Sequence, residues 1–283
     1  MSDTAAPQLR CGSISLDLSS PIVMGVLNVT PDSFSDGGSF ALQENAVTHA
    51  GLMLASGAKI IDVGGESTRP GAESVTVQQE LNRVVPVVEM LIKEYQCLVS
   101  VDTSSPEVML AAAEAGAVLI NDVRALQRDG ALDVVAKLDL PVCLMHMQGQ
   151  PVDMQSNPQY SSITQDVSAF FDRRIDACLA AGIARDRLLL DPGFGFGKTL
   201  AHNLELLSHL NRFTSYGLPL LVGMSRKTMI GQILDKPVDQ RLFGSVAAAV
   251  LAVERGAHIV RVHDVVETVD ALRIVEALRL RNN

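Results

Sequence analysis

The sequence has 283 residues, 47% of them hydrophobic, and a formal net charge of −9. This length and apolar content allow a large buried core, and α/β barrels reach this size as one domain. The acidic balance and the absence of basic runs argue against nucleic acid or an anionic membrane as a partner, and no apolar run approaches the roughly 18 residues of a membrane span.

The N-terminal segment and the cysteines indicate the compartment. The stretch MSDTAAPQLRCG has no basic segment followed by a hydrophobic one, so we expect no secretory signal. Four cysteines lie far apart without a C-x-x-C pair, which favours reduced thiols in a cytoplasmic protein over metal ligands or disulfides. Residues 8–20 have the pattern of a small β-hairpin that would cover the bottom of a barrel.

Eight short apolar segments alternate with helix-length segments along the rest of the chain. Near-continuous Val, Ile and Leu strands separated by helices indicate a parallel sheet buried on both faces. We therefore predict one α/β domain over residues 1–283, a (βα)8 TIM barrel with its core at about 20–282; an open, doubly wound sheet is the alternative. The expected strands are 21–28, 59–64, 97–103, 117–122, 141–147, 187–192, 219–225 and 258–264, and the expected helices include 41–56, 76–95, 105–115, 161–180, 240–255 and 265–281.

A weak internal repeat supports this architecture. LASGAKIIDV, AEAGAVLIND and VERGAHIVRV each run from a helix end through Gly-Ala into a strand. Gly57, Gly116 and Gly256 stand where a helix closes through a left-handed residue. The recurrence predicts one βα unit used repeatedly.

Every expected strand ends on a polar residue. The active site of a (βα)8 barrel lies at the carboxyl ends of its strands. Any one of these residues could simply begin a loop, but eight successive polar ends, with donors, acceptors and both charges, indicate a polar site. They are Asn28, Asp62, Asp102, Asn121 with Asp122, His146, Asp191, Ser225 with Lys227, and Arg261 with His263.

The last two strands carry the features of an anion site. Arg261 and His263 are two residues apart and so face the same way on a strand. Asp264 could cap the following helix, whose N-terminal N–H groups would face an anion. The segment VGMSRKT adds two cations, and loops after the seventh and eighth strands often form a phosphate site in this architecture. The alternative for Arg261 is a surface salt bridge.

The acceptors form a second group. Asp102, Asn121 and Asp191 end the third, fourth and sixth strands, and Lys227 could meet a ring carbonyl. Carboxylates accept from adjacent ring N–H groups and an amide both donates and accepts, so this set suits a flat, amide-bearing bicyclic ring. The alternative is that one or two of them cap helices, above all Asp102 before TSSPEV.

Three loops are rich in glycine. LLLDPGFGFGKT fails both the phosphate-loop pattern and the dinucleotide pattern by one residue, which leaves open what its glycines do. The loops at 28–40 and 64–72 combine glycines, prolines and hydroxyls and are long for βα connections, which is typical of mobile lids. An arginine in the second could close on an anionic second substrate.

Eight segments together resemble the bacterial dihydropteroate synthases, over about residues 8–280. They are MGVLNVTPDSFSDGG, GGESTRPGA, VDTSSPEV, LIND, LMHMQG, LLLDPGFGFGK, LLVGMSRK and HIVRVHDV. The resemblance implies an enzyme of folate biosynthesis that joins 6-hydroxymethyl-7,8-dihydropterin diphosphate to p-aminobenzoate and releases pyrophosphate. It also implies Mg²⁺, competition by sulfonamides and a homodimer.

The resemblance also implies roles for single residues. Asn28 would hold Mg²⁺, and Arg261, His263, Lys227 and Asn28 would be catalytic. Pterin diphosphate would contact Thr68, Asp102, Asn121, Met145, Asp191, Gly223, Lys227, Arg261 and His263. The p-aminobenzoate would contact Phe34, Arg69, Pro70, Phe196 and Thr228, the last standing where the family often has serine.

The chemistry of these groups suggests that departure of pyrophosphate precedes attack by the arylamine. A CH₂ on an electron-rich pterin can form a stabilised cation, and metal, arginine and histidine would stabilise the leaving oxygens. Closure of the two long loops would exclude water. Pterin-dependent methyltransferases and non-catalytic pterin-binding proteins are the alternatives. A methyltransferase would not need the diphosphate clamp or the S-T-R-P loop, and a binding protein would leave Asn28, the loop at 28–40 and the metal site without purpose.

Overall fold

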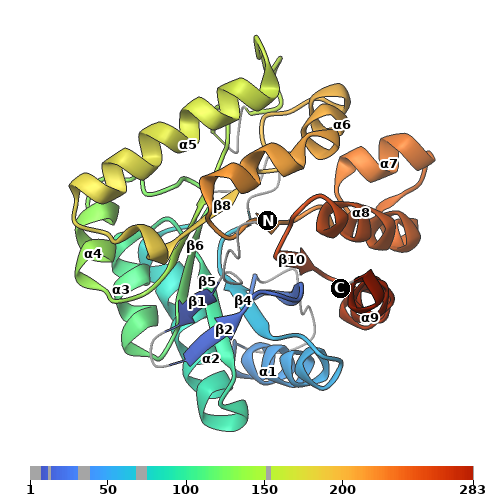
Figure 1. The fold of residues 1–283 in the computed structure, drawn as a ribbon. Coiled ribbons are helices and arrows are strands. Elements are labelled where there is room, and N and C mark those ends of the chain that lie inside the picture. Colours follow the sequence, from blue (N-terminus) through green and yellow to red (C-terminus); the bar gives the residue numbers. More distant parts are fainter. Residues whose placement is uncertain (1–7, 12–13, 31–38, 68–74, 151–153, 283) are drawn as a thin grey trace.

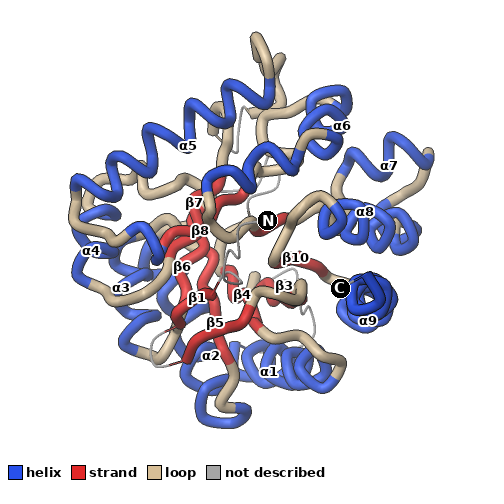
Figure 2. Tube along the Cα trace, viewed as in Figure 1, coloured by secondary structure: helices blue, strands red, loops and turns tan. Residues whose placement is uncertain are grey.

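Eight parallel strands form a nearly closed barrel with helices around its outside, as the computed structural model shows (Figures 1 and 2). The structure describes residues 8–11, 14–30, 39–67, 75–150 and 154–282. The predicted α/β barrel is therefore confirmed, and the open-sheet alternative is wrong. The strands are β3 (Ile22–Asn28), β4 (Ile60–Gly64), β5 (Leu98–Asp102), β6 (Leu119–Asp122), β7 (Val142–Met145), β8 (Leu188–Asp191), β9 (Leu221–Val222) and β10 (Ile259–Val262).

The strands follow one another around the barrel, with β10 returning to lie between β3 and β9. The seam between β8 and β9 is the thinnest in the described barrel. It consists of an isolated bridge between Leu190 and Leu220, in which Leu190 N donates to Pro219 O at 3.0 Å. Short β9 therefore closes the barrel with few backbone bonds.

All six expected helices are present, with ends that differ by up to two residues. Three shorter helices, seven to nine residues long, were not expected: α4, α6 and α7. The helices are α1 (Ser39–Ala55), α2 (Val77–Tyr95), α3 (Pro106–Glu114), α4 (Ala131–Lys137), α5 (Ile163–Ala180), α6 (Leu200–Ser208), α7 (Thr228–Leu234), α8 (Leu242–Glu254) and α9 (Val265–Asn282), with 3₁₀ turns η2 (Arg185–Arg187), η3 (Leu210–Tyr216) and η4 (Val238–Gln240).

The three repeated glycines end helices as expected. Gly57, Gly116 and Gly256 have φ angles of 105°, 106° and 98°, which side chains rarely tolerate. Each is followed by an alanine whose N–H bonds back into the helix, and the chain then enters the next strand. The motif that repeats in the sequence is thus the same helix end, used before three different strands.

The bottom of the barrel is closed by the expected hairpin, β1 (Gln8–Cys11) with β2 (Ile14–Asp17). Leu9 and Cys11 of the hairpin are buried against inward-facing residues of the strands. This lower cluster comprises Leu9, Cys11, Leu18, Ile22, Met24, Ile60, Leu119, Cys143, Leu189, Leu221 and Ile259. It holds the strands in register beneath their polar ends. In the described part of the chain, no helix is both long and apolar enough to cross a membrane.

Candidate active site

Arg261 links the ends of three strands at the upper mouth of the barrel. Its Nε donates to Asp62 Oδ2 at 2.5 Å and its Nη2 donates to Asp102 Oδ2 at 2.8 Å. Asn121 Nδ2 donates to the same Asp62 oxygen at 3.0 Å. The structure therefore brings Asp102, Asn121 and Arg261 together, as the strand ends predict. Asp62 connects Asn121 to Arg261 by accepting a hydrogen bond from each; the sequence predicted it only as one of the polar strand ends.

Burial and charge oppose each other in this cluster. Burial raises the pKa of Asp102 to about 7, although the Arg261 guanidinium counteracts the shift. Burial alone would lower the pKa of Arg261, but the carboxylates of Asp62 and Asp102 raise it above its ordinary value. Arg261 is thus a permanent cation, and Asp102 sits near the point where it gains a proton. The ion pair of Arg261 is not a surface salt bridge, because the Arg261 side chain is only 22% exposed.

Asp191 and Lys227 form a second charged group, on either side of the seam between β8 and β9. Asp191 is buried and its Oδ1 accepts a hydrogen bond of 2.8 Å from Gly193 N. Lys227 Nζ donates to Phe194 O at 2.5 Å and lies 4.5 Å from the centre of the Phe196 ring. Burial lowers the pKa of Lys227 to about 8 against the opposing charge of Asp191, and burial raises the pKa of Asp191.

The loops after β9 and β10 are fastened to each other. Ser225 Oγ accepts from His263 N at 3.2 Å and lies 3.1 Å from His263 Nδ1. The Asp264 carboxylate forms an ion pair with Arg226, with Nε to Oδ2 at 3.0 Å. Arg226 was missed in the sequence, where only its positive charge was noted. Thr228 opens α7 close by and is exposed.

Asn28 lies beside this cluster at the end of β3. Its Oδ1 and Asp102 Oδ2 are each 3.8 Å from the point that a Cβ on Gly64 would occupy, so the glycine keeps the space between them open. Mg²⁺ prefers oxygen ligands and usually keeps waters and substrate phosphates in its shell. An amide oxygen next to a carboxylate fits that ion only with a substrate to complete its shell. No group of three His, Cys, Asp or Glu able to hold a metal occurs among the described residues.

The remaining predicted residues divide into three kinds. Met145 and Gly223 are buried near the cluster, and the Cβ position of Gly223 lies 3.7 Å from Arg261 Cβ. Asp122 instead holds the loop after β6, because it accepts from Ser104 Oγ and from the backbone N–H groups of Arg124 and Leu126. Phe34, Thr68, Arg69 and Pro70 lie outside the described residues.

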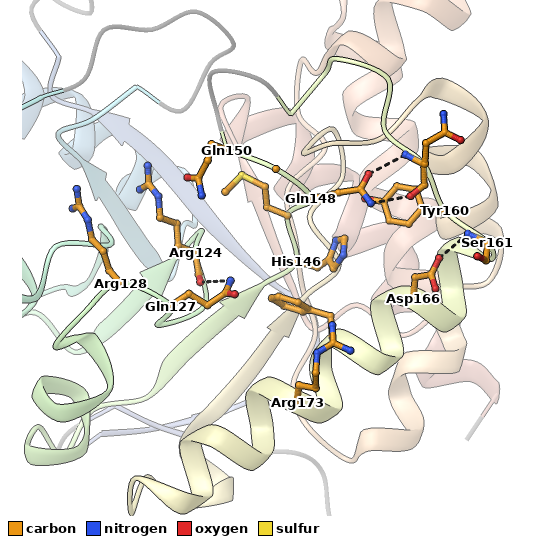
Figure 3. Close-up of a pocket in the computed structure, with 14 residues that line it drawn as sticks. Arg124, Gln127, Arg128, His146, Gln148, Gln150, Tyr160, Ser161, Asp166 and Arg173 are labelled. Carbon is orange, nitrogen blue, oxygen red and sulfur yellow. Dashed lines mark hydrogen bonds between the residues drawn. The ribbon is translucent and has the colours of Figure 1, made fainter.

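A polar depression of about 1000 Å³ lies beside the loops that follow β6 and β7 (Figure 3). His146 stands near its middle, and Gln148 bonds there to the backbone of Gln159. None of the residues predicted to bind the pterin lines it. The residues that line it include Arg124, Gln127, Arg128, His146, Gln148, Gln150, Tyr160, Asp166 and Arg173. The depression shares the strand end His146 with the mouth of the barrel.

Comparison with known proteins identifies the family of this chain. The pterin-binding enzyme family matches residues 24–263. The dihydropteroate synthase of Escherichia coli K12 is 58% identical over 263 residues, 93% of each chain. The Yersinia pestis dihydropteroate synthase, solved with a sulfonamide drug, has a TM-score of 0.92 at 58% identity, covering 96% of this chain and 99% of that one. The Xanthomonas albilineans enzyme in complex with 7,8-dihydropteroate has a TM-score of 0.89 at 48% identity, with coverage of 96% and 99%.

Proposed function

The chain belongs to the dihydropteroate synthases of the pterin-binding enzyme family, and from this premise we propose how its residues act. The enzyme condenses 6-hydroxymethyl-7,8-dihydropterin diphosphate with p-aminobenzoate to give 7,8-dihydropteroate and pyrophosphate. The observation that carries our assignment of residues is the position of Arg261. It stands on β10 beside His263, yet it bonds to Asp62 and Asp102 across the mouth.

Asp102, Asn121, Asp191 and Lys227 read the pterin ring. Two carboxylates accept from ring N–H groups, the amide both donates and accepts, and the ammonium donates to the ring carbonyl. All four groups are half-buried or buried, so their hydrogen bonds are little weakened by water. Thr68, Met145 and Gly223 complete this subsite.

Arg261 and His263 hold the diphosphate. A guanidinium has five N–H donors, and the bonds to Asp62 and Asp102 engage two of them, so the same group can also bind phosphate oxygens. Ser225 orients the His263 ring, and Arg226 with Asp264 holds the loop behind it. Asn28 would hold Mg²⁺, which when bound supplies positive charge to the diphosphate.

Departure of pyrophosphate runs ahead of attack by the arylamine. Arg261 and His263 stabilise charge on the leaving oxygens, and the electron-rich pterin stabilises the CH₂ that remains. The p-aminobenzoate is enclosed by Phe34, Arg69, Pro70, Phe196 and Thr228; Phe196 supplies a ring already held near Lys227. The arylamine loses its proton to water after attack, so no strong general base is required.

Two measurements test this account. Steady-state release of pyrophosphate from the two substrates separates a synthase from a methyltransferase or a binding protein, because only the synthase releases it. For the order of steps, the ester oxygen that joins the pterin CH₂ to the α-phosphorus is labelled with ¹⁸O, and the enzyme is supplied without p-aminobenzoate. We expect the label to scramble into non-bridging positions. Normal turnover without scrambling would favour attack concerted with departure.

We further propose that the protein is a homodimer in the cytoplasm. A patch of exposed apolar side chains on α7, η4 and α8 supports a second copy as its cover: Ile233, Leu234, Val238, Phe243 (81% exposed) and Leu251. All four cysteines are free thiols, which suits a reducing compartment. Sedimentation should give a dimer for the parent and a monomer for Phe243→Glu. A dimer in both would remove this patch from the interface.

A further inference from the structure

Lys198 is a buried lysine with an unusual set of partners. It is 3% exposed, and no ion pair found among the described residues includes it. Its Nζ lies 2.9 Å from His146 Nδ1, 2.9 Å from Gly193 O, 3.0 Å from Phe196 O and 3.3 Å from His146 O. A charged side chain is costly to bury, and these contacts offset part of that cost.

The partners of Lys198 belong to two segments, the loop at 192–199 and the residue that follows β7. These segments touch backbone to backbone, because a Cβ on Gly193 would overlap the carbonyl oxygen of His146 and one on Gly197 would overlap that of Gln148. The two glycines thus permit the close approach of the two segments, and the hydrogen bonds of Lys198 hold the segments together. The near match to a phosphate loop is explained here: the lysine points inward and binds its own loop.

The same loop carries both contacts of Lys227. Phe194 O accepts from Lys227 Nζ, and the Phe196 ring lies against the same ammonium. Lys198 binds Gly193 O and Phe196 O, which bracket this stretch of four residues. Movement of the loop would therefore move the acceptor and the ring that locate the Lys227 ammonium.

We propose that Lys198 is a positioning residue: it holds the loop at 192–199 against β7 and thereby sets the position of the Lys227 ammonium for the pterin ring. The inference rests on the proposed role of Lys227 in reading the pterin. Lys198 itself touches neither substrate.

The three nearest partners of Lys198 match the donors of an ammonium, whereas its burial works against the charge. An ammonium has three hydrogens, which match His146 Nδ1, Gly193 O and Phe196 O. Burial and the charge of Lys198 lower the pKa of His146 to about 2, so its ring is neutral and Nδ1 can accept when the proton is on Nε2. Burial also lowers the pKa of Lys198, with Asp191 opposing the shift and Lys227 adding to it.

The experiment is a double-mutant cycle on pterin affinity. Lys198→Met keeps the length of the side chain and removes its donors, and 6-hydroxymethyl-7,8-dihydropterin is titrated by calorimetry. We expect Lys198→Met to weaken binding about tenfold in the parent, and less than about twofold in a Lys227→Met background. Lys137→Met, at an exposed lysine of α4, is the matched control and should bind like the parent.

A change in the pH profile separates positioning from a loss of structure. The groups that face Lys227 are Asp191, Arg261, Asp102 and Lys198 itself, whose charge interacts with that of Lys227, and burial is the main cause of the lowered pKa of Lys227. A loosened loop admits water, and loss of the Lys198 charge acts in the same direction, so the basic limb of pterin binding should move to higher pH in Lys198→Met. If that variant does not fold, Lys198→Gln keeps two donor hydrogens and should show a smaller shift in the same direction.

Two results would overturn the proposal. If the effects of Lys198→Met and Lys227→Met multiply, Lys198 does not act through Lys227. An unmoved basic limb in a folded Lys198 variant would have the same meaning. If Lys227→Met alone binds the pterin normally, the proposed reading of the ring by Lys227 fails first, and this inference fails with it.

Discussion

Strand β8 places Leu189 in the apolar lower cluster and Asp191, two residues further on, among charged groups at the upper mouth. Both side chains are buried and both face into the barrel. At the lower end, hairpin residues pack against the strands and fill the interior of the barrel. At the upper end, charged side chains such as Arg261 and Asp62 line the mouth. One strand thus contributes to a lower layer of apolar residues, which stabilises the fold, and to an upper layer of charged residues, which binds substrate. Substitutions in the two layers should have different effects.

The largest expected effect is on stability, from the lower layer. Leu189→Ala removes a buried side chain and should lower the free energy of unfolding by about 2–5 kcal/mol. Pterin affinity of the folded protein should stay within about twofold of the parent. Urea unfolding and calorimetric titration at low temperature give the two numbers. A variant that lost affinity while keeping its stability would show that the two layers are not separate.

The next largest effect is expected for Arg261→Ala in the upper layer, which should lower turnover more than pterin affinity. Each charged hydrogen bond contributes about 1.5–3 kcal/mol, so kcat should fall at least tenfold. Because the change leaves Asp62 and Asp102 without their cation, Arg261→Lys is the control that keeps the charge near them. Steady-state kinetics and pterin titration should show a larger loss in kcat than in affinity. Parental turnover in Arg261→Ala would refute the diphosphate clamp.

Asp191→Asn should act on affinity with little effect on folding. The new NH₂ would face a ring N–H that also donates, at a cost of about 1–3 kcal/mol, or about 5- to 150-fold in pterin affinity. The thermal midpoint without ligand should change far less than in Leu189→Ala. Normal affinity with a collapsed midpoint would make Asp191 structural, and the ring site would then rest on Asp102 and Asn121.

The smallest expected effect is the dependence of pterin binding on pH. Asp102 accepts from the ring as a carboxylate, so binding should weaken as pH falls below about 7, where it gains a proton. Lys227 donates best as an ammonium, so binding should also weaken as pH rises above about 8, where it loses one. Each limb is at most tenfold per pH unit. Titrations from pH 5.5 to 9.5 should give a maximum near 7–8, and Lys227→Met should abolish the basic limb.

The barrel and its polar mouth could be predicted because each depends on local pattern. Runs of Val, Ile and Leu mark the strands, and the fold itself brings their carboxyl ends together. Helices α4 and α7 were missed because seven residues are too few for a clear helical period. Helix α6 has nine residues, as α3 does, but lacks the proline that marks the start of α3.

Partners across the mouth could not be predicted. Arg261 and Asp62 are 199 positions apart, and the pattern of strands does not say which of several acceptors a long side chain will reach. Lys198 was harder still, because its spacing from the glycines resembles a phosphate loop and only the overlap at Gly193 reveals the inward turn.

The thin seam between β8 and β9 has a consequence for motion. With a single isolated bridge, this joint should open more often than the other strand pairs, and its amides should exchange with deuterium faster. Asp191 and Lys227 stand on opposite sides of it. A pterin ring bound to both would act as a clip across the joint, so the substrate itself would complete the closure of the barrel.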